Sequence, residues 1–394
     1  MDYNKIISLI ENRRERVLNN KYNCLPFPFQ SLLKCGYPGT EMGKYICVTA
    51  NQKVCKSKFC DFVYVYNSLF FCMEHPEVKV KILYFCLEES AKKKWLDFQC
   101  HLLYRLNNII ISSSELMSTS APVSEDIVNL LKSKEYLRYY KKFEEMVTFM
   151  DTTKNPTGIY KICEDYMLKQ GHYNYVETIV RDPLGNEEVS KKIDPADPYM
   201  PIDPEQYNIV IVDNATNISS ERGMSKMQTI ETFSKYAIRL RDVFNMTVIL
   251  IQHQAQAQES LENTKANRLA PTSDGLGDCK VVVRDINTLI GLYNPYKHQV
   301  MEHKHYSIPR FKDHIRFVQI IEDRDYGTAG TVFGLFFNGA STYFKELPPP
   351  QDREAVEKVY KYIEEMDKRP SLLLCIINKL SNLFNHDPIT NTKK

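Results

Sequence analysis

The amino-acid sequence predicts an α/β fold built on a mostly parallel sheet with helices on both faces. Short apolar runs rich in β-branched and aromatic residues recur along the chain, and helical patterns lie between several of them. Strands that are apolar along their whole length are typical of parallel sheets buried on both faces. A third observation is a lysine–serine pair after the first such run, where a phosphate-binding loop would join a strand to a helix.

The first predicted element is an amphipathic helix over residues 1–19. Ile6, Ile10 and Val17 fall on one side of it, and most charged residues fall elsewhere. A helix of this length is marginal alone and needs a surface on which to dock. A connection containing proline and glycine then leads to the main domain, which we expect to begin at residue 25.

The main domain is expected to span residues 25–348. Strands are predicted at residues 45–49, 82–87, 209–212, 247–251, 288–292 and 317–321. A long helix is predicted from the three- and four-residue spacing of apolar residues, namely Met227, Ile230, Phe233, Ala237, Leu240 and Phe244.

Two further segments flank or interrupt this pattern. Residues 107–204 contain two helical patterns and a hairpin-turn signal at residues 182–185, and we interpret them as an elaboration of the main domain. Residues 349–394 follow a run of three prolines and are predicted to form an extension, with helices at 354–366 and 372–384 and a polar tail.

The composition limits the class of protein. The 51 basic and 49 acidic side chains nearly cancel, so any contact with nucleic acid must come from a local patch. The 11 cysteines form no Cys-x-x-Cys pair, which disfavours a zinc ribbon or a disulfide framework and favours a reducing cytoplasm. No segment reaches about 18 uninterrupted apolar residues, so we expect no membrane span.

The candidate phosphate-binding loop follows the strand at 45–49. It consists of Ala50, Asn51, Gln52, Lys53, Val54, Cys55, Lys56 and Ser57. In such a loop, backbone N–H groups surround phosphates, the lysine contacts the terminal phosphates and the hydroxyl binds Mg²⁺. Both glycines of the G-x-x-x-x-G-K-[ST] pattern are missing here, and a lysine–serine pair is also common in a solvated first helical turn. The motif alone leaves both interpretations open.

Carboxylates follow two of the predicted strands. Asp213 ends the strand at 209–212, where a carboxylate beside a phosphate-binding loop would bind Mg²⁺. Glu88 and Glu89 follow the strand at 82–87, and such a carboxylate could polarise an attacking water. The alternatives are a helix cap for Asp213 and an exposed strand end for the glutamates.

Taken in order, these elements resemble the ATPase motor of DnaB-type replicative helicases, most closely the bacteriophage variety. Cys86-Leu87-Glu88 resembles the family's Ser-Leu-Glu element, and residues 209–213 resemble its Walker B strand. Leu250-Ile251-Gln252 resembles the strand whose glutamine senses the γ-phosphate. Residues 274–285 resemble the second DNA-binding loop, and residues 323–327 resemble the Lys-x-Arg-x-Gly finger strand. Order and spacing match across residues 25–348.

The resemblance implies a RecA-like P-loop NTPase fold that uses ATP and Mg²⁺. It places Lys56 on the β- and γ-phosphates and makes Ser57 and Asp213 the Mg²⁺ ligands. It makes Glu88 the catalytic carboxylate and Gln252 the sensor. It also makes Arg324 an arginine finger offered to the next subunit of a homohexameric ring, because a planar, permanently charged guanidinium can neutralise charge that develops on the γ-phosphate.

The resemblance also implies partners and a location. Lys265, Arg268, Lys280 and Arg284 would contact single-stranded DNA in a central channel, whereas their simpler interpretation is a solvated surface loop. A primase or a helicase loader is the expected further partner. The expected location is the cytoplasm, that of the host cell if the chain is encoded by a phage.

The sequence departs from the family at three places. Lys53 and Cys55 stand where glycines are usual, and Glu322 stands where the finger strand usually has a lysine. The helix at 1–19 resembles the linker helix of full-length helicases, whose globular N-terminal domain has no counterpart in residues 1–24. We therefore expect an ATP-dependent helicase motor, with a catalytically weakened or inactive structural or regulatory subunit of a replication complex as the alternative. A strand-exchange recombinase is disfavoured by the finger strand at Arg324.

Overall fold

The structure is a computed structural model that describes residues 3–119, 121–181, 187–266 and 268–368. These residues form two compact units that alternate along the chain. Unit 1 comprises the described parts of residues 1–91, 141–293 and 317–333, and unit 2 comprises those of residues 92–140, 294–316 and 334–394.

A nine-stranded sheet is the largest sheet among the described residues, and its strand order is β17-β16-β15-β12-β3-β11-β10-β4-β5. Within this order, the successive strands β12, β3, β11, β10, β4 and β5 pair in parallel. The pairs β12–β15 and β16–β17 are antiparallel. The strands are β3 (Tyr45–Ala50), β4 (Val80–Cys86), β5 (Val147–Met150), β10 (Tyr207–Asp213), β11 (Thr247–His253), β12 (Thr288–Tyr293), β15 (Ile315–Asp323), β16 (Val332–Asn338) and β17 (Tyr343–Glu346). All six predicted strands are present, and their ends lie within two residues of the prediction. The mostly parallel α/β sheet is confirmed.

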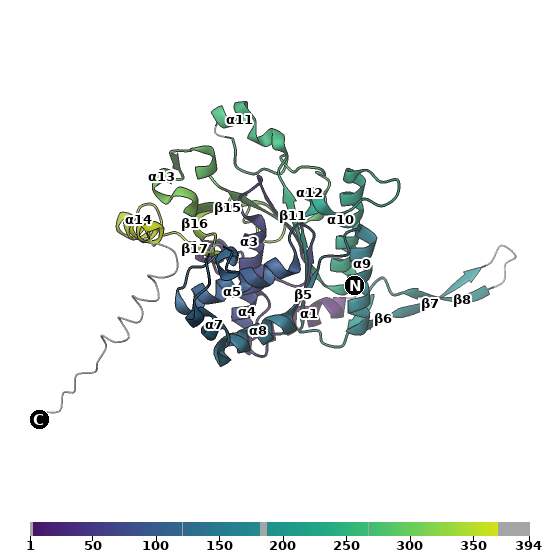
Figure 1. Ribbon diagram of the computed structural model, residues 1–394. Helices are drawn as coiled ribbons and strands as arrows, with labels where there is room; N and C mark the ends of the chain where they lie inside the picture. Colours follow the sequence, from purple (N-terminus) through teal and green to yellow (C-terminus); the bar gives the residue numbers. More distant parts are fainter. Residues whose placement is uncertain (1–2, 120, 182–186, 267, 369–394) are drawn as a thin grey trace, which may run out of the picture. The chain divides into compact units, whose positions relative to one another are not determined.

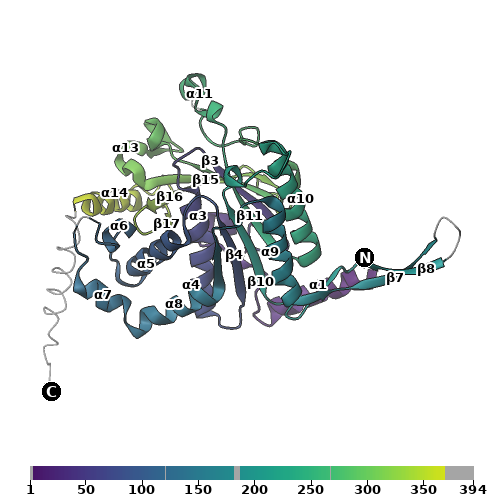
Figure 2. The same cartoon turned by 45° about the vertical axis from the view of Figure 1, so that its right-hand side comes forward.

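Helices cover both faces of the parallel strands in unit 1. Figures 1 and 2 show α9 (Pro156–Lys169) and α10 (Lys226–Phe244) on one face and α3 (Lys56–Cys60) with α4 (Asn67–Glu74) on the other. A π-helical segment, η1 (Asp61–Tyr66), joins α3 to α4. The predicted long helix is α10, which begins with a capping box between Ser225 and Gln228.

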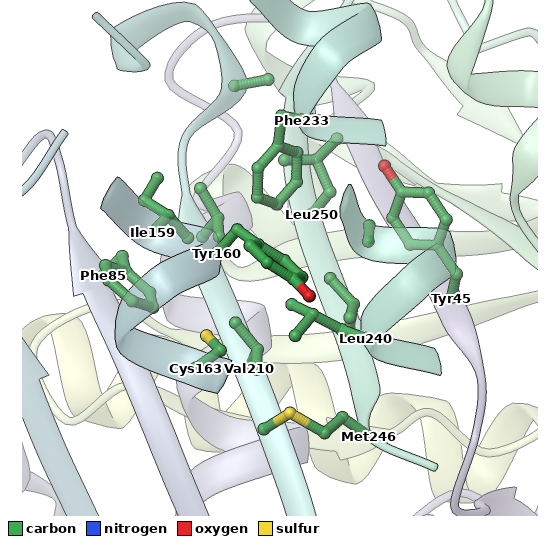
Figure 3. Packing of buried hydrophobic residues seen from close by; sticks show 14 of the residues in the cluster. Tyr45, Phe85, Ile159, Tyr160, Cys163, Val210, Phe233, Leu240, Met246 and Leu250 are labelled. Atoms are coloured by element: carbon green, nitrogen blue, oxygen red, sulfur yellow. The ribbon is translucent and has the colours of Figure 1, made fainter. Parts of the chain in front are cut away.

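The main core of unit 1 lies between the strands and the two helices α9 and α10. Alternate residues of the strands, such as Val210 and Leu250, pack against Ile159 on α9 and against Phe233 and Leu240 on α10 (Figure 3). All five side chains are buried. Because burial of one such side chain contributes about 1.5–3 kcal/mol, this layer fixes where the strand ends lie.

The remaining elements of unit 1 are short, apart from the first helix and one hairpin. They are α1 (Tyr3–Leu18), β1 (Leu25–Pro26), α2 (Gln30–Lys34), β2 (Gly39–Thr40), β6 (Gly171–Tyr173), β7 (Tyr175–Arg181), β8 (Glu187–Ile193), β9 (Tyr199–Pro201), η2 (Ala215–Asn217), η3 (Gln256–Glu259), α11 (Leu261–Lys265) and α12 (Val282–Asp285). The predicted N-terminal helix corresponds to α1. The predicted turn at 182–185 lies outside the described residues, but the strands on either side of it pair as a hairpin.

Unit 2 is mostly helical. Its elements lie wholly or mostly in this unit: α5 (Ala91–Asn107), α6 (Ser113–Leu116), α7 (Glu125–Leu131), α8 (Lys134–Met146), η4 (Tyr296–His298), β13 (Glu302–His303), β14 (Tyr306–Ser307), α13 (Ile308–Phe311), η5 (Lys312–His314), β16, β17 and α14 (Arg353–Lys368). The helix predicted at 354–366 corresponds to α14, and the one predicted at 372–384 lies outside the described residues.

The domain boundaries at residues 25 and 348 remain predictions. In the described part of the chain, no helix combines the length and apolarity that crossing a bilayer requires.

A buried histidine in unit 2 makes its stability depend on pH. His101 on α5 is buried, and its Nδ1 lies 3.0 Å from the carbonyl oxygen of Ser341. Burial lowers the pKa of His101 from 6.5 to about 4, although the hydrogen bond to Ser341 acts in the opposite direction. Below pH 6.5 the unfolded chain takes up a proton that the folded chain accepts only near pH 4, so stability is lost across this interval.

We expect His101 to remove about 2 kcal/mol of stability between about pH 8 and pH 5. The variant His101→Asn retains an N–H donor for the Ser341 carbonyl group but cannot be protonated in this range. Urea unfolding of the native chain should therefore lose more stability at low pH than unfolding of the variant. Equal pH dependence in the two proteins would show that His101 is not the group that responds.

Candidate nucleotide site

The candidate loop has the backbone shape that the missing glycines would favour. It connects the end of β3 to Lys56, the first residue of α3. Lys53 and Cys55 both adopt left-handed conformations, with φ angles of 59° and 70°. Each non-glycine residue in this region costs about 1–2 kcal/mol, so the surrounding packing must hold the loop in place. Val54, which is buried, and the Asn51 amide, which donates to the Leu269 carbonyl at 3.2 Å, provide such contacts.

The two predicted Mg²⁺ ligands lie side by side. The Ser57 hydroxyl donates to Asp213 Oδ1 at 2.8 Å, and the Tyr84 hydroxyl donates to Asp213 Oδ2 at 3.1 Å. Asp213 is only 1% exposed and ends β10, which is separated from β3 by β11. A hydroxyl and a buried carboxylate are oxygen donors of the kind that Mg²⁺ prefers, so these residues fit the ion.

Lys56 points into the loop rather than to solvent. Its Nζ donates to the carbonyl oxygens of Ala50 and Asn51, at 3.3 and 3.1 Å, and lies 2.8 Å from His253 Nδ1. Burial lowers the pKa of Lys56 from 10.5 to about 8, and the negative charges of Glu88 and Asp213 partly offset this effect. The lysine is thus a poorly solvated cation that an anion in the loop would stabilise.

Two residues that the sequence analysis missed connect Lys56 to Glu88. His253 Nε2 lies 3.1 Å from Asn214 Nδ2, and Asn214 also donates a short hydrogen bond to Glu88. Burial, followed by the positive charge of Lys56, lowers the pKa of His253 to about 4, which keeps the ring neutral at ordinary pH. The predicted catalytic carboxylate and the predicted phosphate-binding lysine therefore lie at the two ends of a chain of close contacts through Asn214 and His253.

Gln252, the predicted sensor, points to the opposite face of β11. Its side chain is buried, and its Nε2 donates to the carbonyl oxygens of Gly277 and Cys279, at 2.5 and 3.1 Å. Asp213 pairs with Ile251 in register. Side chains alternate along a strand, so His253 shares the face of Asp213 and Gln252 does not. The structure brings His253, rather than Gln252, to Lys56.

The predicted arginine finger contacts its own unit away from the loop. Arg324 is exposed, and its guanidinium donates to the carbonyl oxygens of Val283 and Arg284, at 3.3 and 2.5 Å. Neither of these acceptors belongs to residues 50–57. Glu322, which replaces the usual lysine, is partly buried on β15 opposite Leu289.

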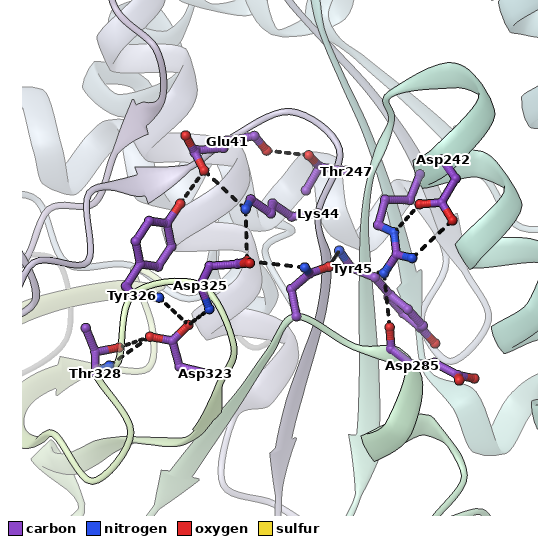
Figure 4. Close-up of polar contacts among 12 residues, drawn as sticks. Glu41, Lys44, Tyr45, Asp242, Thr247, Asp285, Asp323, Asp325, Tyr326 and Thr328 are labelled. Carbon is purple, nitrogen blue, oxygen red and sulfur yellow. Dashed lines mark hydrogen bonds and ion pairs between the residues drawn. The ribbon is translucent and has the colours of Figure 1, made fainter. Parts of the chain in front are cut away.

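A polar network holds the turn that carries Arg324 (Figure 4). Asp323 accepts hydrogen bonds from the backbone and the hydroxyl of Thr328, at 2.9 and 2.6 Å. Although burial raises the pKa of Asp323, these bonds and others from the turn backbone hold it below its usual value. Lys44 forms two ion pairs. Its Nζ lies 2.8 Å from Asp325 Oδ2 and 3.3 Å from Glu41 Oε2. The turn is therefore fixed to the start of β3.

The four predicted DNA contacts are spread over one long connection after β11. Lys265 ends α11 and Arg268 is exposed three residues later. Lys280 precedes α12, Arg284 lies within it, and both are exposed. Their contacts with single-stranded DNA remain predictions.

Comparison with known proteins supports the fold. No protein-family model and no curated protein matches the sequence. Among solved structures, the ATPase domain of a phage DnaB-like helicase is similar with a TM-score of 0.59 and 13% identity, covering 88% of this chain and 100% of that one. A DnaB-like replicative helicase, described with its interactions with primase, is similar with a TM-score of 0.60 and 13% identity, covering 85% of this chain and 66% of that one. The chain therefore has the RecA-like α/β fold of these helicase ATPase domains.

Proposed function

We propose that this chain binds a Mg²⁺–nucleotide and works as a DnaB-like, ATP-dependent helicase motor in replication. The observation that carries the proposal is the loop after β3, where Lys56 lies beside the hydrogen-bonded pair of Ser57 and Asp213. Mg²⁺ would supply charge that neutralises the phosphates. Within the chain, Ser57 and Asp213 would hold the ion, and residues 50–57 would surround the phosphates with backbone N–H groups.

The hydrolytic roles follow from the polar chain beside the loop. Glu88 is exposed at the end of β4 and would orient the attacking water as the catalytic carboxylate. We assign the sensor role to His253 in place of Gln252, because His253 contacts Lys56 and, through Asn214, Glu88. A nucleotide that draws Lys56 away from His253 would change this chain of contacts and so signal its presence to the catalytic carboxylate.

The motor function requires further copies and DNA. Arg324, which is exposed and donates to the carbonyl oxygens of Val283 and Arg284, would act on the nucleotide of the neighbouring copy in a homohexameric ring. The exposed cations Arg268, Lys280 and Arg284, together with Lys265, would contact single-stranded DNA in the channel. A primase or a loader would be a further partner, and the location would be the cytoplasm.

Two features support a second candidate, a catalytically weakened subunit that retains assembly. Lys53 and Cys55 keep side chains at left-handed positions close to where phosphates would lie. Glu322 places a negative charge on the finger strand, where it would repel phosphate. Because the residues that would hold Mg²⁺ are intact, these changes would weaken nucleotide binding and hydrolysis rather than abolish binding.

Titration with a fluorescent ATP analogue tests nucleotide binding directly. The native chain should bind it in the presence of Mg²⁺, more tightly with single-stranded DNA, and Asp213→Asn should weaken Mg²⁺-dependent binding at least tenfold because one ligand charge is lost. The matched control is Asp165→Asn, which changes an exposed carboxylate on α9. Absence of binding by the native chain under both conditions would exclude the motor and leave the structural role.

A further inference from the structure

The carboxylate of Asp213 is held by donors from two different elements. Ser57 on α3 donates to its Oδ1 at 2.8 Å, and the Tyr84 hydroxyl on β4 donates to its Oδ2 at 3.1 Å. Asp213 and Tyr84 are both buried, with exposed fractions of 1% and 0%. Water does not replace a hydrogen bond that a buried carboxylate loses, so rotation of this group away from either donor is unfavourable. The carboxylate therefore has a fixed orientation.

The strand register brings Tyr84 to this carboxylate. In the parallel pair of β4 and β10, Tyr84 lies opposite Ile211, and Asp213 lies two residues further along β10. Residues two apart on a strand share a face, so Tyr84 and Asp213 are diagonal neighbours within reach of an aromatic side chain. On its other side β4 pairs with β5, and the ring centroids of Tyr84 and Phe149 lie 5.5 Å apart. Packing therefore holds the phenol ring in place beside Asp213.

Tyr84 is a neutral donor to Asp213. Burial, followed by the negative charge of Asp213, raises the pKa of Tyr84 well above its usual value, so the hydroxyl keeps its proton. A protonated phenol can donate a hydrogen bond but adds no positive charge beside the carboxylate. An arginine or a lysine at this position would neutralise the carboxylate and compete with a bound cation. Tyr84 therefore orients Asp213 and leaves its negative charge available.

The two oxygens of Asp213 differ in what they offer a cation. The Ser57 hydroxyl donates its hydrogen to Oδ1 and keeps lone pairs, so a cation bound by Ser57 would meet Asp213 on the Oδ1 side. The other oxygen, Oδ2, accepts from Tyr84. Mg²⁺ demands near-octahedral geometry at about 2.0–2.1 Å, whereas Ca²⁺ takes about six to eight oxygens at about 2.3–2.6 Å and accepts both oxygens of one carboxylate. A carboxylate with one oxygen engaged by a phenol suits the smaller ion.

We propose that Tyr84 sets the cation preference of the nucleotide site by limiting Asp213 to one coordinating oxygen. This inference rests on the proposed function, because it concerns the ion that Ser57 and Asp213 would hold. Tyr84 is a positioning residue that acts through Asp213. While Oδ2 stays on the phenol, the site favours Mg²⁺, which needs no second oxygen from the carboxylate, over Ca²⁺, which gains from one.

Nucleotide binding with each cation in turn tests this preference. The ratio of the dissociation constants of a fluorescent ATP analogue with Mg²⁺ and with Ca²⁺ measures it without any hydrolysis. Tyr84→Phe removes the hydroxyl and keeps the ring, and we expect it to shift this ratio at least fivefold towards Ca²⁺. The matched control is Tyr64→Phe, which removes a buried hydroxyl that has no hydrogen-bond partner in the described part of the chain. Its ratio should equal that of the native chain.

A second variant covers the case in which Tyr84→Phe does not fold. Tyr84→Met also lacks the donor, and its flexible side chain can fill the space that the ring leaves. Thermal unfolding identifies the folded variants, and each folded variant without the hydroxyl should show the shift. An unchanged ratio in a folded Tyr84 variant would overturn the inference even if both dissociation constants change, because such a change reflects the stability of the site and not its choice of cation.

Cation binding without nucleotide separates this inference from the proposed function. Free Mn²⁺ gives a paramagnetic resonance signal that is lost on binding, and the binding that Asp213→Asn abolishes belongs to this site. Displacement of that Mn²⁺ by Mg²⁺ and by Ca²⁺ gives the same ratio for the cations alone.

The two readouts together distinguish the outcomes. If the native chain binds cations with a ratio that Tyr84→Phe shifts but binds no nucleotide, the role of Tyr84 stands and the motor function is wrong. If nucleotide binds and the ratio is indifferent to Tyr84, the motor function stands and this inference is wrong. A native chain that binds neither cation nor nucleotide would overturn both.

Discussion

Replacement of Lys56 by alanine is expected to lower ATP hydrolysis at least a hundredfold, which corresponds to about 2.7 kcal/mol of barrier. Lys56 is the buried cation of the loop, and its pKa is lowered to about 8 because few water molecules reach it. A bound phosphate would replace the hydration that the Lys56 ammonium group loses on burial, so the charged lysine and the nucleotide would stabilise each other. Steady-state hydrolysis with Mg²⁺ and single-stranded DNA measures the loss.

The matched control for this substitution is Lys34→Ala, which removes an exposed lysine on α2. Its hydrolysis should equal that of the native chain. Thermal unfolding of both variants separates an effect on folding from an effect on the site, because Lys56 also donates to two loop carbonyl groups. Unchanged hydrolysis in Lys56→Ala would show that this loop does not bind the reacting nucleotide.

The sheet could be predicted from the sequence because its strands are locally distinct. The parallel strands are apolar over most of their length, and β10 is buried from Tyr207 to Asp213. This pattern predicts a strand without any knowledge of its neighbours. The position of Lys56 at a helix start followed for the same reason, since a strand, a short loop and a helix are consecutive in the sequence.

His253 and Asn214 could not be found in this way, because their roles depend on the register between strands. Gln252 and His253 are adjacent on β11, and only the pairing of Ile251 with Asp213 decides which of them shares the face of the loop. The sequence contains the polar pair but not the register. The useful signal is that two polar residues in succession at a strand end must point to opposite faces, so each is a candidate until the register is known.

The exposed apolar side chains of α1 and of the hairpin formed by β7 and β8 show a related limit. The stripe of Ile6, Ile10 and Val17 was visible in the sequence, and the turn signal at residues 182–185 indicated a hairpin. Whether such faces are covered within the chain depends on packing between distant segments, which composition does not describe. In the structure, Arg13 and Arg16 pair with Glu41 and Glu205, and Ile10 and Val17 remain exposed.

The loop conformation bears directly on the choice between a motor and a structural subunit. Lys53 and Cys55 adopt the positive φ angles that glycine would adopt without steric cost. The loop therefore keeps its shape, but its backbone is strained at these two residues. Their Cβ atoms also occupy space where a glycine would let the backbone approach a phosphate closely. This combination predicts that nucleotide binding is weakened rather than abolished.

Restoring the glycines and the finger-strand lysine should raise ATP hydrolysis at least tenfold, or about 1.4 kcal/mol of barrier. The variant combines Lys53→Gly, Cys55→Gly and Glu322→Lys. The glycines remove strain and side-chain bulk from the loop, which should strengthen nucleotide binding. The lysine replaces a repelling charge with an attracting one where negative charge develops in the transition state. Nucleotide titration and steady-state hydrolysis measure the two effects separately.

The control for the loop is Lys53→Ala with Cys55→Ala, in the background of Glu322→Lys. Alanine shortens both side chains but keeps the Cβ atoms and the cost of positive φ, so this variant should gain less than the glycine variant does. An equal gain in both would assign the effect to side-chain bulk instead of backbone strain.

Strong, DNA-stimulated hydrolysis by the native chain that none of the substitutions changes would mean that the loop functions as it stands. Neither binding nor hydrolysis in any of these proteins would instead favour the structural subunit.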